Sequence, residues 1–465
     1  MRLTREQLLK LMGAAAVGPV AAAIDPSPAE AQQRHDEHVI RRDVCVIGGG
    51  SSGTYTAVRL RDLGRSVVVV EAKDRLGGHT ETYQDPATGG TVDIGVIVFE
   101  DDPLVHAYFD RFGIALAPLT GAPGPTRYVD FRTGRPVDYT PHPPTALPAY
   151  YDLISQYGPI DTVLDPPNPV PRDLVAPFAD FVAKYDLGSV VPVVFGYGQG
   201  LGNILDLPAL YSINTVGQGV VRNILNNSFL TTAAHDNSLL YERAAGFLGP
   251  DVLLNSQVLR VDRSSSGVRV RISTPRGPRL IVADRLVVAI PPLPRNLAGF
   301  DLDAAERSLF GQFISGAYYT GVVRLSGLPA GLSLSDAAAG TPFNLPRLPG
   351  LYGVGPTGIP GLYNVKFGSP SLLPEALVRR SIRAEIERVA AAGTYPVVFE
   401  DFAVFSGHVP FALHVPPQAI AAGFYRRLQA LQGRNRTYYP SAAFHSHNSS
   451  RIWAGVELLL PSIAS

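Results

Sequence analysis

The sequence predicts an α/β fold in which helices cover a parallel sheet and a second, α+β part is inserted into the chain. Three observations carry this expectation. The folded part opens on a strand, a glycine-rich turn, a helix and a second strand over residues 43–71. Valine and isoleucine fill both strands almost without a polar break, as in parallel sheets buried on both faces. A strand-rich block over residues 252–290 follows a proline-rich stretch that suits loops and helices.

The expected elements follow from the periodicity of apolar residues and from the turn residues between them. In chain order they are strand 43–47, helix 51–63, strand 66–71, helix 173–185, strands 252–254, 257–262, 268–273 and 279–290, a helix near 303–310, strands 317–325 and 361–367, and helices 374–391, 417–431 and 451–460.

Composition narrows the choice of partners. Forty basic residues balance forty acidic ones in 465 residues, so no net field attracts nucleic acid or an anionic membrane, and no basic stripe suggests a nucleic-acid interface. The single cysteine, Cys45, excludes internal disulfide bonds and a cysteine-based metal site, and no metal is expected. Beyond the N-terminal segment no stretch reaches ~18 uninterrupted apolar residues, so no stable membrane span is expected.

Residues 1–31 are predicted to be an export signal. Basic residues precede an apolar run over 11–23, and Ala-Glu-Ala at 29–31 offers a cleavage site. We therefore expect a secreted or periplasmic protein. If the segment is instead an unstructured extension, the protein is cytoplasmic.

The glycine-rich turn has the spacing of a dinucleotide-binding loop. Gly48, Gly50 and Gly53 form a G-x-G-x-x-G pattern between an apolar strand and an amphipathic helix. The first glycine permits the tight turn, the second lets the backbone approach a pyrophosphate, and the third allows close packing of helix and sheet. Ser51 and Ser52 open the helix, whose N-terminus attracts phosphate through free N–H groups.

An acidic residue and a second glycine pair follow. Glu71 ends the second strand 18 residues after the motif, near the interval of about 20 expected for a ribose-binding carboxylate. Gly77 and Gly78 would let the chain pass a ligand at backbone distance, and Lys73 and Arg75 would neutralise phosphate charge.

The segment Glu-Ala-Lys-Asp-Arg-Leu-Gly-Gly-His-Thr at 71–80 resembles the flavin amine-oxidase superfamily, whose members carry E-A-R-x-R-x-G-G-R-x there. The resemblance implies FAD as the cofactor and a Rossmann-like FAD-binding domain. It further implies that Thr80, Ile97, Val98 and the backbone of Val258 contact FAD.

Two positions call for separate expectations. His79 replaces the superfamily's usual arginine, and we expect a phosphate or flavin neighbour there, or a covalent attachment point for the flavin. Ser449 lies at the start of the last helix, whose N-terminus could stabilise negative charge on the reduced flavin. An ordinary capped C-terminal helix is an equally good interpretation.

The implied domains are discontinuous. The FAD-binding domain takes residues 41–100, 245–295 and 425–465, and the substrate domain takes 101–244 and 296–424.

The nearest branches by resemblance are the β-cyclopiazonate dehydrogenases and the polyunsaturated fatty-acid isomerases. Short matching segments lie at 195–198, 408–409, 431–433 and 436–439, and together they resemble the isomerase branch more. The lysine that amine oxidases place near the flavin has no counterpart at 316–320, which argues against a typical amine oxidase.

Candidate catalytic residues are therefore aromatic groups and imidazoles. Phe195, Tyr197 and Tyr319 could wall a flat apolar site. His408 and His445 could accept a proton, because an imidazole titrates near neutrality. A structural role is the alternative for each of these residues, and it is the commoner one for such residue types.

The expected reaction is hydride abstraction by oxidised flavin from a C–H bond next to a double bond, heteroatom or ring of a small, largely apolar molecule. O2 is the expected electron acceptor. Two alternatives stay open: an isomerase that returns the hydride and leaves the mass unchanged, and a non-catalytic carrier of the same fold.

Overall fold

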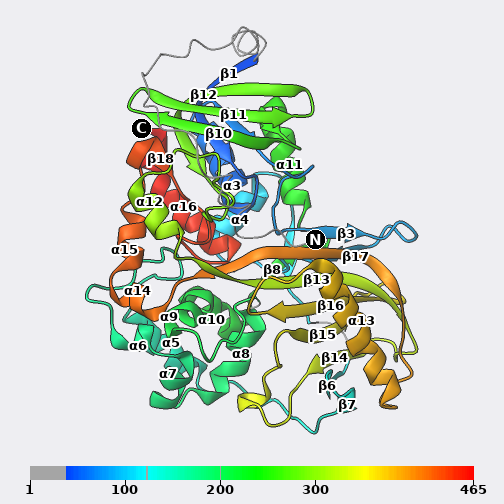
Figure 1. Ribbon diagram of the computed structural model, residues 1–465. Coiled ribbons are helices and arrows are strands. Elements are labelled where there is room, and N and C mark those ends of the chain that lie inside the picture. The colour runs from blue at the N-terminus through cyan, green and yellow to red at the C-terminus, as the bar shows by residue number, and fades with distance from the viewer. Residues whose placement is uncertain (1–37, 122–123, 199) are drawn as a thin grey trace, which may run out of the picture. The chain divides into compact units, whose positions relative to one another are not determined.

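The computed structural model describes residues 38–121, 124–198 and 200–465, and the predicted export signal lies outside them. Within these residues the strands form two seven-stranded sheets and two small two-stranded ones (Figure 1). Residues Val39–Ser465 make up one compact unit.

The first sheet is built on the predicted βαβ unit. β1 (His38–Ile47) pairs in parallel with β2 (Val67–Val70), which pairs in parallel with β9 (Val252–Leu253). α3 (Ser51–Asp62) connects the first two strands. All four valines of β2 are buried, which explains why this strand lacks the alternation of a half-exposed one.

An antiparallel meander extends this sheet beyond β1. It consists of β10 (Gln257–Ser264), β11 (Gly267–Thr274) and β12 (Gly277–Val288), and β12 lies beside β1. β18 (Thr437–Tyr438) pairs in parallel with β12. The sheet thus collects strands from three distant parts of the chain, in keeping with a discontinuous domain; the domain boundaries themselves stay a prediction.

The C-terminal helix closes one side of the first sheet. α16 (Ser449–Ala464) packs against α3, with α4 (Pro103–Asp110) and α11 (Leu239–Leu248) nearby. Trp453 on α16 is fully buried, and its ring stacks at 5.7 Å on both Tyr55 and Phe99.

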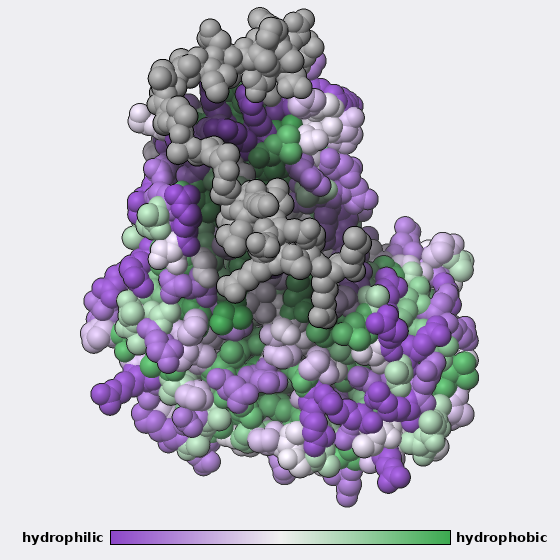
Figure 2. Space-filling model, in the orientation of Figure 1, coloured by the Kyte–Doolittle hydropathy of each residue, from purple (hydrophilic) through white to green (hydrophobic). Residues whose placement is uncertain are grey.

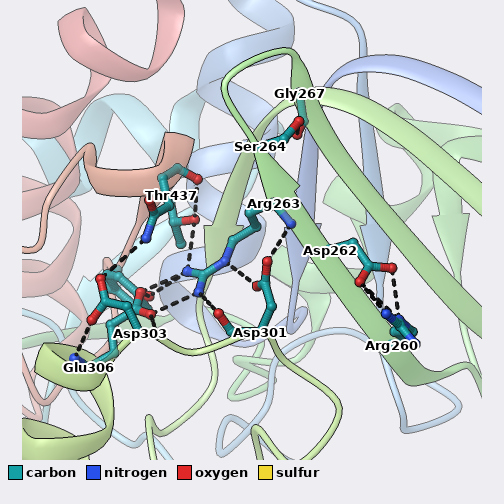
Figure 3. A network of polar contacts seen from close by, with 11 residues as sticks. Arg260, Asp262, Arg263, Ser264, Gly267, Asp301, Asp303, Glu306 and Thr437 are labelled. Carbon is teal, nitrogen blue, oxygen red and sulfur yellow. Dashed lines mark hydrogen bonds and ion pairs between the residues drawn. The ribbon is translucent and has the colours of Figure 1, made fainter. Parts of the chain in front are cut away.

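A buried ion pair ties the meander to later segments (Figure 3). The guanidinium of Arg263 on β10 donates to both carboxylate oxygens of Glu306, at 2.7 and 2.8 Å. Glu306 belongs to α12 (Ala304–Phe310), whose capping box it forms with Asp303. Both side chains of the pair are 1% exposed, so the pair lies in the interior.

The second sheet has the order β17-β13-β16-β15-β14-β6-β7. Its strands are β6 (Thr126–Asp130), β7 (Arg135–Pro136), β13 (Ile314–Ser326), β14 (Ser333–Asp336), β15 (Gly350–Pro356), β16 (Leu362–Ser369) and β17 (Val398–His414). One face is covered by α13 (Glu375–Ala391), which buries Val378, Ile382 and Val389 against it (Figure 1).

The remaining elements are short. The helices are α5 (Leu147–Ser155), α6 (Arg172–Val175), α7 (Phe178–Lys184), α8 (Val191–Tyr197), α9 (Ala209–Thr215), α10 (Gln218–Asn226), α14 (Pro417–Ala421) and α15 (Phe424–Gln429). The small sheets pair β3 (Thr82–Gln84) with β4 (Thr91–Asp93) and β5 (Leu116–Pro118) with β8 (Leu230–Thr232).

Two expected helices need correction, and one long strand was not expected. The helix expected over 173–185 is two helices, because Pro177 cannot donate in a helix and Ala176 before it is extended, with ψ 153°. The helix expected over 417–431 is interrupted at Gly423, which has φ 75°. The strand β17 was not predicted, since Gly407 and Pro410 interrupt its pattern.

Side chains on the face drawn in Figure 2 mix hydrophilic and hydrophobic residues. In the part of the chain that the structure describes, no helix is both long and apolar enough to cross a membrane.

Candidate functional site

A cavity of about 690 Å³ is lined by most of the predicted cofactor residues and by residues of β13, β16 and β17 in the second sheet. The predicted residues that line it are Gly48, Gly50, Ser51, Ser52, Glu71, Lys73, Gly77, Gly78, His79, Thr80, Ile97, Val98 and Ser449. Gly53, Arg75 and Val258 are not among its lining residues.

The glycine turn has the geometry that its pattern predicted. Gly48 has φ 97°, a conformation that residues with a side chain rarely adopt. A Cβ atom on Gly53 would lie 1.9 Å from the carbonyl oxygen of Gly48. Gly53 therefore packs the helix onto the turn rather than facing the cavity, which is the packing role assigned to the third glycine.

Glu71, which directly follows β2, stabilises the glycine turn through its carboxylate. Its Oε2 accepts from the backbone N–H of Gly49 at 2.6 Å, and its Oε1 accepts from that of Lys73 at 2.8 Å. Each carboxylate oxygen can accept a second hydrogen bond, so the residue can still hold ribose hydroxyls.

The second glycine pair lies directly against the first motif. A Cβ atom on Gly78 would lie 2.9 Å from the Cα atom of Gly50. Lys73 lines the cavity and donates from Nζ to the carbonyl oxygen of Gly78 at 3.1 Å. The two glycine segments therefore form one narrow backbone channel suited to a pyrophosphate.

Arg75 does not line the cavity and contacts protein groups, so its expected role toward phosphate stays a prediction. Its guanidinium donates to the carbonyl oxygen of Thr80 at 2.8 Å and to Glu81 at 2.9 Å. Ser406 on β17 donates to the same carboxylate at 2.8 Å. Arg75 thus braces the loop against the second sheet, and sequence spacing could not distinguish this from a phosphate contact.

Asn237, which sequence reasoning did not identify, binds the backbone of Val96 and Ile97. Its side-chain N–H₂ group donates to the carbonyl oxygens of Val96 and Ile97 at 2.9 and 3.2 Å. Its backbone N–H donates to Asp93 at 3.0 Å. Burial raises the pKa of Asp93 to about 7.

The N-terminus of α16 also reaches the cavity. Asn448 is its N-cap and accepts from the backbone N–H groups of Ser450 and Arg451. Its side chain donates to the buried Glu100, which also pairs with Arg451. Ser449, the first helical residue, lines the cavity beside this cap, so the positive end of the helix dipole points toward the site.

The far end of the cavity is a stack of aromatic rings and imidazoles. His79 stacks on His408 with centroids 4.7 Å apart and an interplanar angle of 13°. Tyr318 lies 5.5 Å from His408, its partner across β13 and β17. Phe411 lies 5.6 Å from His79 and 4.8 Å from His447.

The imidazoles at this end are neutral at pH 7. Burial lowers the pKa of His408 to about 3 and that of His447 to about 4. Burial and the nearby His408 lower the pKa of His79 well below its ordinary value. The Nε2 atoms of His408 and His447 are buried without a hydrogen-bond partner, so each is available to a bound molecule.

Two of the predicted catalytic residues, His408 and Tyr197, line the cavity, whereas Tyr319, His445 and Phe195 do not. Tyr319 lies on the opposite face of β13, where its hydroxyl donates to the carbonyl oxygen of Leu373 at 2.7 Å.

His445 is held behind α16. Its Nδ1 lies 2.8 Å from the carbonyl oxygen of Thr162, and its ring lies against Gly455. Phe195 lines a second cavity instead.

Tyr318, His447, Phe411 and Lys366 line the first cavity without having been predicted. Strand periodicity could have offered Tyr318 as an alternative to Tyr319, because neighbouring residues face opposite sides of a sheet. His447 lies two residues beyond His445, in the segment that precedes α16. The sequence gives no sign of which of the two faces the cavity. Lys366 and Phe411 carry no local signal.

The residues of this cavity fit FAD. One end offers a glycine channel, a helix N-terminus and the carboxylate of Glu71, which suit a dinucleotide. The other end offers flat rings together with the buried, unpartnered Ser441 hydroxyl and His408 Nε2.

Known proteins share this architecture. Residues 46–112 match the family described as NAD(P)-binding Rossmann-like domain. The solved structure of a CLA-producing fatty acid isomerase from P. acnes superimposes with a TM-score of 0.72, covering 90% of this chain and 98% of that one at 19% identity. A cyclohexylamine oxidase from Brevibacterium oxydans superimposes with a TM-score of 0.63, covering 91% of this chain and 98% of that one at 20% identity. These likenesses show the fold.

Closer relatives match more than nine tenths of the chain. The FAD-dependent oxidoreductase oblC of Cochliobolus heterostrophus is 37% identical over 93% of each chain. The FAD-dependent oxidoreductase pigF of Monascus ruber is 37% identical over 96% of each. The β-cyclopiazonate dehydrogenase of Aspergillus oryzae is 34% identical over 92% of this chain and 94% of that one.

The fold has an amine-oxidase-like architecture, and the closer relatives show that the protein is a flavin-dependent enzyme. The chain belongs to the family of FAD-dependent oxidoreductases that includes β-cyclopiazonate dehydrogenase. Its cofactor is FAD, as the segment 71–80 predicted.

Proposed function

We propose that this protein oxidises a small, largely apolar organic molecule by removing a hydride from an activated C–H bond, with O2 as the final electron acceptor. One observation carries the proposal: the dinucleotide channel and the aromatic end belong to a single cavity. FAD supplies the hydride acceptor when it is bound. The chain's own residues then orient the substrate and exclude water.

The apolar lining supports a flat, apolar substrate. Tyr197, Phe229 and Phe411 line the cavity together with aliphatic side chains. Such walls hold a conjugated molecule by area and by ring stacking.

The neutral imidazoles support hydride rather than acid–base chemistry as the main step. An imidazole whose pKa lies near 3, as that of His408 does, remains unprotonated at pH 7 and binds protons weakly. Its role in this proposal is to orient the substrate through the unpartnered Nε2 atom.

The test is anaerobic mixing of the FAD-loaded protein with a panel of flat, apolar compounds that carry allylic, benzylic or heteroatom-adjacent C–H bonds. We expect loss of flavin absorbance with one compound, a product two hydrogens lighter, and recovery of absorbance with peroxide when O2 enters. A product of unchanged mass would identify the isomerase instead. A flavin that no compound reduces would favour the carrier. Acid precipitation of the same sample decides covalent linkage, since flavin in the pellet would direct attention to His79.

We further propose that residues 1–31 direct export. The protein recovered from its source should then begin at Gln32, which intact mass measurement detects. Recovery of the full-length chain from the cytoplasm would contradict this proposal.

A further inference from the structure

A second cavity, of about 420 Å³, adjoins the first. Gly196 and Lys366 line both cavities. The second cavity is walled by aromatic rings and lies between α8 and strands β14 and β15 of the second sheet, and its rings are Tyr128, Tyr139, Phe195, Phe343 and Tyr352. The two cavities thus meet at one lysine.

The pleat of β16 points Lys366 into this junction. Its neighbours Val365 and Phe367 are buried in the core beneath α13, so Lys366 between them faces the other side of the sheet. It pairs with Thr320 on β13 and with Gly353 on β15.

Lys366 has no anionic partner among the described residues. Its ammonium group makes no ion pair or hydrogen bond there, and burial alone lowers its pKa. Asp336 lines the second cavity, but it accepts from the backbone N–H of Phe131 and is not among the groups that shift the pKa of Lys366. An enclosed ammonium group without a counter-charge costs free energy unless a ligand supplies one.

Phenol groups lie at the same junction. Tyr318 lines the first cavity and Tyr352 the second. Burial raises the pKa of Tyr318 to about 12, so it stays protonated and can donate to an oxygen anion.

We propose that Lys366 binds an acidic oxygen of the substrate, a carboxylate or an acidic enol, so that the substrate is a flat organic acid. The carbon to be oxidised lies on the FAD side, and the rest of the molecule extends into the second cavity. That the bound acid is the substrate rests on the proposed function. The anion site itself does not depend on turnover.

The test compares an anion with its neutral isostere. The FAD-loaded protein is titrated by calorimetry with 2-naphthoate and with 2-naphthamide. We expect the wild type to bind naphthoate at least about tenfold more tightly, as a charge-assisted hydrogen bond provides. Lys366→Met should abolish the preference, while the matched control Lys184→Met, at an exposed lysine paired with Asp173, should keep it. Equal binding of both probes by the wild type, or a preference that survives in Lys366→Met, would overturn the proposal.

A measurement on the wild-type chain guards against misfolding of Lys366→Met. The chain has only four lysines, so reductive ¹³C-methylation gives few NMR signals, and Lys366→Arg assigns the one in question. We expect this signal to titrate below the ordinary pKa of a lysine, and its pKa to rise when naphthoate is added. An unchanged pKa would count against the anion site.

The junction itself is tested at Gly196. A Cβ atom there meets no atom within 4 Å, so side chains can be accommodated on α8. Gly196→Leu should weaken naphthoate binding roughly tenfold by filling the junction, and Gly196→Ala should leave it nearly unchanged. Unaltered binding in Gly196→Leu would place the anion elsewhere.

Flavin reduction measured on the same samples separates the two proposals. A naphthoate preference without reduction by any compound would uphold the anion site and refute the proposed function. Reduction by neutral compounds without a naphthoate preference would do the reverse.

Discussion

At the residue scale, Tyr318 and Tyr319 show how one position in a strand decides a role. Tyr318 faces the cavity beside His408. Tyr319 faces the core, where its hydroxyl donates to the carbonyl oxygen of Leu373 and accepts from the Leu373 N–H at 2.8 Å. The two residues are adjacent and chemically identical, so they form a natural matched pair.

We expect Tyr318→Phe to alter substrate turnover or binding with little effect on stability. Tyr319→Phe should lower the free energy of unfolding by about 0.5–1.5 kcal/mol, because it removes hydrogen bonds to the part-buried backbone groups of Leu373. Urea denaturation and steady-state kinetics of both variants check this. The assignment fails if Tyr319→Phe changes turnover while Tyr318→Phe does not.

Glu71 carries a second residue-scale prediction. Glu71→Gln removes one carboxylate oxygen that holds the backbone N–H groups of Gly49 and Lys73. We expect the FAD dissociation constant to rise at least about tenfold, since hydrogen bonds to a charged acceptor are worth about 1.5–3 kcal/mol. Titration of apoprotein with FAD measures it, with the exposed Glu242→Gln as control. An unchanged constant would show that the carboxylate charge is dispensable.

At the element scale, the glycine turn before α3 and the loop after β2 work as one channel. Gly77 donates from its backbone N–H to the carbonyl oxygen of Gly49 at 2.8 Å. Gly78 touches the turn so closely that no side chain fits. The approach of these two loops depends on glycine at both of them.

Gly78→Ala should therefore abolish FAD binding or leave it severely weakened. Gly64→Ala is the matched control, because both glycines have positive φ, +59° and +78°, but a Cβ on Gly64 meets nothing within 4 Å. In both variants the strained backbone conformation should lower the free energy of unfolding by about 1 kcal/mol. Only Gly78→Ala should lose FAD. The flavin absorbance of the purified proteins measures this. Equal FAD content would contradict the close-approach argument.

At the scale of the whole molecule, the Arg263–Glu306 pair joins segments far apart in the chain (Figure 3). Burial opposes ionisation of Glu306, but hydrogen bonds from Arg263 and Tyr439 outweigh it and hold the pKa of Glu306 below its ordinary value. The stabilisation is therefore present above the unfolded-state pKa and is lost as pH falls through the lower folded-state pKa.

Glu306→Gln should destabilise the protein by about 1.5–3 kcal/mol at pH 7, because it removes one of the two carboxylates that pair with the buried Arg263 and leaves only Asp301. The difference from wild type should shrink as the pH falls below ~4. Asp262→Asn is the control, since the Arg260–Asp262 pair in the same view is exposed and should contribute little. Urea denaturation across pH measures both; equal losses would refute the role of the buried pair.

The sequence alone determined the βαβ unit, the FAD cofactor and six of the seven strands of the first sheet, all but β18. This was possible because the residues of the dinucleotide end from Gly48 to Thr80 are contiguous, so local turn and helix geometry places them. Only the tertiary structure decided the aromatic end. His79, Tyr318, His408 and His447 come from four distant segments. Their meeting depends on strand register, where a shift of one residue turns every side chain to the other face. For the same physical reason no local pattern marked Lys366.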